Sequence, residues 1–203
     1  LLNKCGIDQR AIYHDLYIRK ENGTYTQIDL AVPTPQGIIV FEVKDYSGWI
    51  FGNGNSKYWM QILAYGEEKH QFYNPIWQNR THINALRKLL PNNPDVPIFN
   101  IVVFYGNSEF KDLNYDTSGR VRVIYNTQVV ELVKHIKSLP PAEYGNKREV
   151  AAVLAEGVRN GRDPEIRQAQ KNLAARAKAN SHESHTYSSG WGFSRRFMRN
   201  ILR

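Results

Sequence analysis

Two acidic residues and one lysine lie in segments that otherwise have the composition of buried β-strands. Residues 27–32 and 38–44 are largely apolar and β-branched, and Asp29, Glu42 and Lys44 are their charged residues. The five residues between the two segments, Pro-Thr-Pro-Gln-Gly, have the composition of a turn. The two segments are therefore predicted to pair as an antiparallel hairpin.

The register of this hairpin decides whether the charged side chains meet. If Pro33 pairs with Ile38, Asp29 lies opposite Glu42. Because side chains alternate along a strand, Glu42 and Lys44 project from the same face. The sequence thus predicts two carboxylates and one amine in one place.

Two facing carboxylates need a compensating positive charge. At a cross-strand spacing of ~5 Å and an effective dielectric near 20, they repel by roughly 3 kcal/mol. Lysine offsets part of this repulsion. A hard divalent cation bound by carboxylate oxygens offsets it better and leaves positions for water and phosphate. The pattern therefore indicates Mg²⁺ or Mn²⁺ as the cofactor.

Asp29 followed by Glu42-Val43-Lys44 resembles the core motif of the PD-(D/E)xK phosphodiesterases. Between about residues 11 and 139 the chain more narrowly resembles the NERD, or nuclease-related, domain. The positions that carry this resemblance are Gln27-Ile28-Asp29-Leu30, the segment 37–44, Tyr46-Ser47-Gly48, Trp59, Asn74-Pro75, Gln78 and Asn79.

The resemblance implies a role for each matching residue. Asp29, Glu42 and the main-chain carbonyl of Val43 would bind the metal, and Lys44 would orient or deprotonate the attacking water. Gln78 would support the active site from a helix. A bound metal lowers the pKa of its water and neutralises phosphate oxygens, which is consistent with phosphodiester hydrolysis.

Three further residues near these motifs have structural or functional interpretations. His82 lies one helical turn after Gln78, and we interpret it as part of a solvated helix face. Trp59 is expected in the core, since buried tryptophan is usually core packing. Gln61 shares its strand face and could contact water or nucleic acid.

Alternating strand and helix patterns predict an α/β fold. The expected strands are 11–18, the hairpin, 49–51, 57–62, 97–105 and 120–125, and the expected helices are 75–90, 127–138, 144–161 and 164–179. We predict a PD-(D/E)xK (restriction-endonuclease-like) core with a mixed central sheet flanked by helices, and a helical C-terminal extension. The predicted divisions are a nuclease core at 1–142, a basic helical extension at 143–180 and a linker with a basic tail at 181–203.

The chain has 203 residues and a formal net charge of +8, which suits a polyanionic partner. Residues 143–203 hold 12 Lys or Arg against 6 Asp or Glu, whereas residues 1–142 hold 15 against 13. Within the tail, Arg195, Arg196 and Arg199 alternate with apolar residues. These arginines could bind nucleic-acid phosphates, or the tail could form an amphipathic helix that docks on a protein partner or an anionic membrane.

The single cysteine, Cys5, allows no internal disulfide, and no apolar segment approaches the ~20 residues needed to span a bilayer. We therefore expect a cytoplasmic protein. The sequence favours a Mg²⁺- or Mn²⁺-dependent nuclease that hydrolyses phosphodiester bonds, with DNA a better candidate substrate than RNA. The alternative is a catalytically silent nucleic-acid-binding or adaptor module with the same fold.

Overall fold

The computed structural model describes residues 2–63 and 66–181. It contains nine strands, in two sheets, and four α-helices, with short 3₁₀ helices at Leu2–Cys5, Gln9–Ala11 and Asn126–Gln128. The strands are β1 (Tyr13–Arg19), β2 (Tyr25–Thr34), β3 (Gly37–Asp45), β4 (Gly48–Asn53), β5 (Tyr58–Leu63), β6 (Glu68–Tyr73), β7 (Ile98–Tyr105), β8 (Ser108–Asn114) and β9 (Val121–Tyr125). The helices are α1 (Pro75–Lys88), α2 (Val129–Ser138), α3 (Lys147–Arg162) and α4 (Pro164–Ser181).

The larger sheet has five strands in the order β1-β2-β3-β7-β9. The β1, β2 and β3 strands pair antiparallel, whereas β3, β7 and β9 pair parallel. The central strand β3 is buried along its length apart from its last residue, Asp45, as its apolar run predicts. The mixed α/β class is confirmed.

A second sheet is a difference from the single sheet that the sequence predicts. It has four strands in the order β6-β5-β4-β8, and two of them, β6 and β8, were not predicted. Both are edge strands whose side chains are mostly exposed and polar, so neither has the apolar pattern of a buried strand. The apolar side of this sheet packs with the larger one around Trp59 and Phe104, which confirms Trp59 as a core residue.

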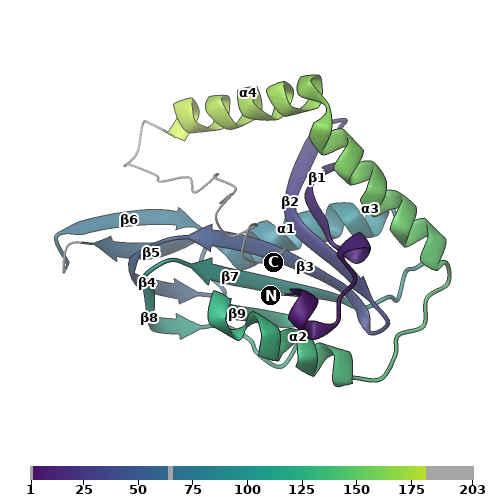
Figure 1. Ribbon diagram of the computed structural model, residues 1–203. Coiled ribbons are helices and arrows are strands. Elements are labelled where there is room, and N and C mark those ends of the chain that lie inside the picture. The colour runs from purple at the N-terminus through teal and green to yellow at the C-terminus, as the bar shows by residue number, and fades with distance from the viewer. Residues whose placement is uncertain (1, 64–65, 182–203) are drawn as a thin grey trace.

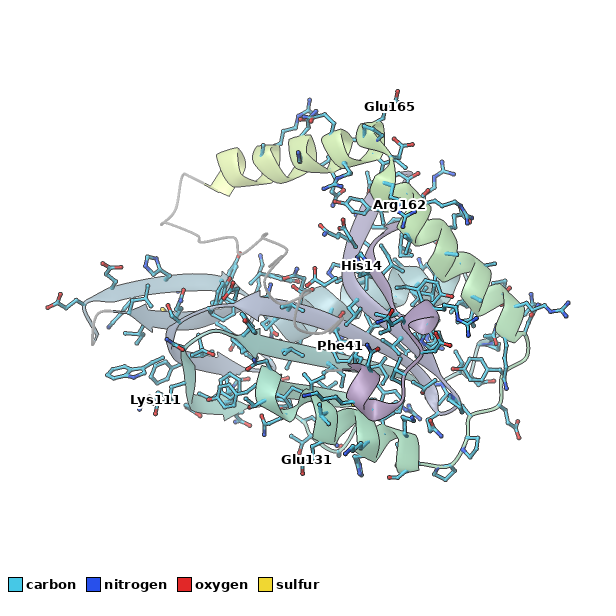
Figure 2. The ribbon with its side chains drawn as sticks, viewed as in Figure 1. His14, Phe41, Lys111, Glu131, Arg162 and Glu165 are labelled. Atoms are coloured by element: carbon cyan, nitrogen blue, oxygen red, sulfur yellow. The ribbon has the colours of Figure 1, made fainter. Side chains whose placement is uncertain are left out.

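Helices cover both faces of the larger sheet (Figure 1). The α2 helix and the N-terminal 3₁₀ segments pack on one face, and α1 and α3 pack on the other. Figure 2 shows Phe41 within the sheet under α2 and Glu131 projecting from the outer side of that helix. Val133 and Ile136 of α2 are buried and Glu131 is exposed, which is the amphipathic pattern that orients this helix.

The start of α1 is fixed by its capping residue. The Asn74 carboxamide oxygen accepts hydrogen bonds from the Ile76 and Trp77 amides, and Pro75 occupies the first helical turn. The Asn74 amide donates to the Ser56 carbonyl and so connects the helix to the loop before β5. This confirms the predicted cap and fixes which side of α1 faces β3.

The α3 helix lies very close to β1. A Cβ atom at Gly161 would be 2.1 Å from the Asp15 carbonyl oxygen, and one at Gly157 would be 3.0 Å from an Ile18 methyl group. These glycines therefore permit a direct helix-to-strand contact that larger residues would prevent. The α3 side chains Val150 and Leu154 are buried in the same apolar cluster as β1 and α1. The predicted division of the chain at residue 142 stays a prediction.

Candidate active site

The hairpin of β2 and β3 has the register that the turn predicts. Pro33 pairs with Ile38, and the ladder continues to Leu30 opposite Phe41. At the turn, Gly37 has a φ of +137°, and a Cβ there would lie 2.3 Å from the Pro97 carbonyl oxygen. Only glycine fits this position, and the register of the charged residues follows from it.

Asp29 is held by the main chain between the other two charged residues. The paired ladder ends one step before Asp29 and Glu42. The prediction that these two residues are ladder partners is therefore wrong. Instead, the Val43 amide donates to the Asp29 carboxylate over 2.8 Å. The Asp29 side chain thus takes the place of a ladder carbonyl and is fixed relative to the strand that carries Glu42 and Lys44.

Glu42 and Lys44 form an ion pair inside the protein. Lys44 Nζ lies 2.8 Å from Glu42 Oε1, and each side chain is only 4% exposed. Lys44 Nζ also donates to Gln78 Oε1 on α1 over 2.9 Å. The structure therefore brings together the predicted residues Glu42, Lys44 and Gln78, on the face of β3 that α1 covers.

His82 belongs to the same group, which the sequence interpretation missed. Its side chain is buried, not on a solvated helix face. His82 Nε2 lies 3.3 Å from Glu42 Oε2, and its Nδ1 lies 2.6 Å from the Thr26 hydroxyl on β2. The spacing of four residues from Gln78 was the available signal, because it places both side chains on one helix face. We refer to Asp29, Glu42, Lys44, Gln78 and His82 as the charged cluster.

Burial and proximity shift the proton affinities in this cluster. Burial, and then the charge of Glu42, raise the pKa of Asp29 to about 8, despite the hydrogen bond from Val43. Burial alone would raise the pKa of Glu42, but Lys44 and His82 outweigh it and hold that pKa below its ordinary value. Burial would lower the pKa of Lys44, yet Glu42 raises it above its usual value. Lys44 therefore stays charged and satisfies one carboxylate but not two.

This imbalance is the feature that a divalent cation would relieve. Two carboxylates and the Val43 carbonyl supply the hard oxygen ligands that Mg²⁺ or Mn²⁺ prefers, so the residues present fit the predicted metal. Within residues 2–63 and 66–181, no three His, Cys, Asp or Glu side chains are grouped as a metal cage. A cation here would therefore also need main-chain, water or phosphate oxygens.

Of the other predicted site residues, one hydrogen-bonds to a neighbouring loop and three lie outside the described residues. Gln61 is buried, and its amide donates to the Ser47 carbonyl over 2.7 Å, so it fixes the loop between β3 and β4. A contact of Gln61 with nucleic acid stays a prediction. The predicted phosphate-binding residues Arg195, Arg196 and Arg199 lie outside the described residues.

Comparison with known proteins gives two matches. Residues 1–105, half of the chain, match the family described as the nuclease-related domain (NERD). The chain is also 29% identical over 146 residues to an uncharacterized protein of Bacillus anthracis, pXO1-01. The match covers 72% of this chain and 65% of that protein. No solved structure matches the chain.

In the described part of the chain, no helix is long and apolar enough to span a membrane.

Proposed function

Because this chain belongs to the nuclease-related domain family, we propose that it is a metal-dependent nuclease that hydrolyses phosphodiester bonds in DNA. We further propose that its larger sheet and α1 form a PD-(D/E)xK core. The observation that carries this proposal is the buried Glu42–Lys44 pair beside Asp29, whose pKa is raised. Charged groups buried in this way with perturbed pKa values are typical of functional sites.

Each residue of the charged cluster would have a definite task. A Mg²⁺ or Mn²⁺ ion held by Asp29, Glu42 and the Val43 carbonyl would acidify its bound water and neutralise phosphate oxygens. Lys44 would hold the attacking water through its ammonium group. Gln78 accepts a hydrogen bond from Lys44 and so limits where that ammonium group can lie.

The substrate would reach the cluster from the side of Asp29 and Gln78. Both are partly exposed, whereas Glu42 and Lys44 are almost fully buried. A phosphate group that approaches from this side would meet Asp29 and its metal first. The net charge of +8 would attract a polyanion, and the resemblance to DNA-cutting enzymes favours DNA over RNA.

A cleavage assay tests this proposal. Supercoiled plasmid and end-labelled single-stranded DNA are incubated with the protein and Mg²⁺ or Mn²⁺, and parallel reactions contain EDTA. We expect cleavage that EDTA abolishes, and that falls to background in Asp29→Asn. We expect a loss of roughly a hundredfold or more in Lys44→Met, which lacks the ammonium group. An RNA panel of equal length tests the substrate preference.

The matched control is Glu149→Gln. Glu149 is a carboxylate of α3 that binds the amides of Asn92 and Asn93, outside the charged cluster. Cleavage by this variant should equal that of the native chain. Cleavage that survives Asp29→Asn and Lys44→Met would reject the site. DNA binding without cleavage, unaffected by metal, would instead support the catalytically silent binding module.

A further inference from the structure

A chain of buried polar contacts connects β2, α1 and β3 behind the proposed metal ligand. Its members are Thr26, His82 and Glu42, which lie far apart in the sequence. The Thr26 hydroxyl is 2.6 Å from His82 Nδ1, and His82 Nε2 is 3.3 Å from Glu42 Oε2. The three residues are only 6%, 6% and 3% exposed, respectively. Solvent therefore does not compete for these contacts.

The chemistry of the imidazole ring determines how this chain is polarised. The Nε2 atom is buried and makes no hydrogen bond of good geometry within the described residues, but the Glu42 carboxylate lies 3.3 Å from it. A lone pair on Nε2 would repel that carboxylate, whereas an Nε2–H group is attracted to it. In the neutral ring, a proton on Nε2 leaves Nδ1 as an acceptor, and the Thr26 hydroxyl can donate to it.

We propose that His82 is a positioning residue for Glu42 and that Thr26 holds it in the Nε2–H tautomer. This inference rests on the proposed function, in which Glu42 binds the metal. Lys44 contacts Oε1 of the carboxylate and His82 faces Oε2, so both oxygens of Glu42 have a partner on the protein. Together these contacts fix the rotation of the carboxylate group. Partners of this kind behind a metal ligand tune its affinity for the metal.

The first test reads the tautomer directly and needs neither metal nor activity. The imidazole ¹⁵N resonances of the uniformly labelled, metal-free chain are recorded, and those of His82 are assigned from their absence in His82→Gln. We expect a proton on Nε2 and none on Nδ1 in the native chain. In Thr26→Val we expect a shift toward the Nδ1–H form. A native ring that carries a proton on Nδ1 would overturn the inference.

The second test measures Mn²⁺ affinity and DNA cleavage on four chains: native, Thr26→Val, His82→Leu and Thr34→Val. Thr34 is a matched control, because it lies on the same strand, is equally buried and donates its hydroxyl to the Gly37 carbonyl. We expect Thr26→Val and His82→Leu to weaken Mn²⁺ binding and lower kcat by roughly ten- to a hundredfold, with KM for DNA little changed. Thr34→Val should match the native chain in both.

A conservative variant distinguishes positioning from packing. The His82→Gln side chain can place an amide N–H near Glu42 but has no imidazole for Thr26 to orient. We expect it to recover part of the affinity lost in His82→Leu, and we expect Thr26→Val to have less effect in the His82→Gln background than in the native one. Equal losses in Thr26→Val and Thr34→Val would overturn the inference while the nuclease proposal stands. A native chain that neither binds Mn²⁺ nor cleaves DNA would overturn both.

Discussion

Helix α1 buries two groups of polar side chains against the sheets, and the two groups differ in the balance of their charges. One is the charged cluster. The other, which we call the amide cluster, consists of Asn74, Asn79 and Asn100. Its amide groups donate to carbonyl oxygens: Asn79 to Val40 and to the side chain of Asn100, and Asn100 to Ile76. Asn79 Oδ1 has no hydrogen-bond partner within the described residues, but an amide carries no net charge. Neutral amides that donate in this way join elements and need no ligand.

In the charged cluster Glu42, Lys44 and His82 are also buried, but the charges of this cluster do not balance. Its two carboxylates face one lysine, and burial together with the charge of Glu42 raises the pKa of Asp29. Burial of an unbalanced carboxylate costs stability and is retained where function requires it. Buried polarity alone therefore does not identify a site. An unbalanced buried charge is the stronger indication.

The largest expected effect comes from removing the countercharge of the charged cluster. Lys44→Met leaves Glu42 and Asp29 buried without their cation, so we expect a loss of about 3–5 kcal/mol in the free energy of unfolding. Urea denaturation measures it. The double variant Glu42→Gln, Lys44→Met should recover part of the loss. A change in Lys44→Met below about 1 kcal/mol would mean that the pair is solvated, and would remove the contrast between the clusters.

A substitution in the amide cluster is expected to cause a smaller loss in the free energy of unfolding. Asn79→Leu leaves the Val40 carbonyl and the Asn100 side-chain oxygen without this donor, at a cost of about 1–3 kcal/mol. Asn84→Leu, at an exposed position of the same helix, should stay within about 0.5 kcal/mol. Well below the melting temperature, Asn79→Leu should keep native Mn²⁺ affinity. A loss of that affinity would assign the amide cluster to the active site.

Asp29→Asn is expected to raise the free energy of unfolding, whereas the two substitutions above lower it. The folded chain raises the pKa of Asp29 from 3.8 to about 8, so folding favours the protonated form and stability falls as the pH rises through this interval. Asparagine carries no charge at any pH. In EDTA at pH 7 to 8 we expect it to stabilise the fold by about 0.5–2 kcal/mol. Thermal melts from pH 4 to 9 measure this, and an equal or lower melting temperature would contradict it.

The smallest expected change in stability comes from removing the Tyr144 hydroxyl, at the opposite end of the hairpin. Tyr144 donates to the Thr34 carbonyl over 2.6 Å, and burial raises its pKa to about 12. Its contribution is therefore present below pH 10 and is lost between about pH 10 and 12. Tyr144→Phe should cost about 1 kcal/mol at neutral pH. Denaturation at pH 8 and 11 checks this, since the native and variant chains should differ less at the higher pH.

The hairpin register and the common face of Glu42 and Lys44 were predictable because both depend on local sequence. The turn composition fixed the pairing of Pro33 with Ile38, and alternation placed Glu42 and Lys44 on one face. The contact of Asp29 with the Val43 amide was not predictable. It depends on where two strands separate, and no local pattern records that.

His82 and the second sheet were missed because they depend on contacts between distant segments. The burial of His82 requires α1 to cross β3 and Thr26 to lie at the start of β2, 56 residues earlier. The β6 and β8 strands are polar because each lies at an edge, so their pairing partners make them strands. Propensity alone does not decide such segments.

The close packing of α3 on β1 determines where this domain could be fused to another domain. The family match ends at residue 105, yet Gly161 touches the carbonyl of Asp15, a residue with a φ of +54° whose charge also acts on Asp29. A chimaera joined at residue 105 would lack this helix, and the face of β1 that α3 covers would be exposed to solvent. A functional fusion should therefore be joined beyond Arg162, and α3 should be inherited together with the strands that it covers.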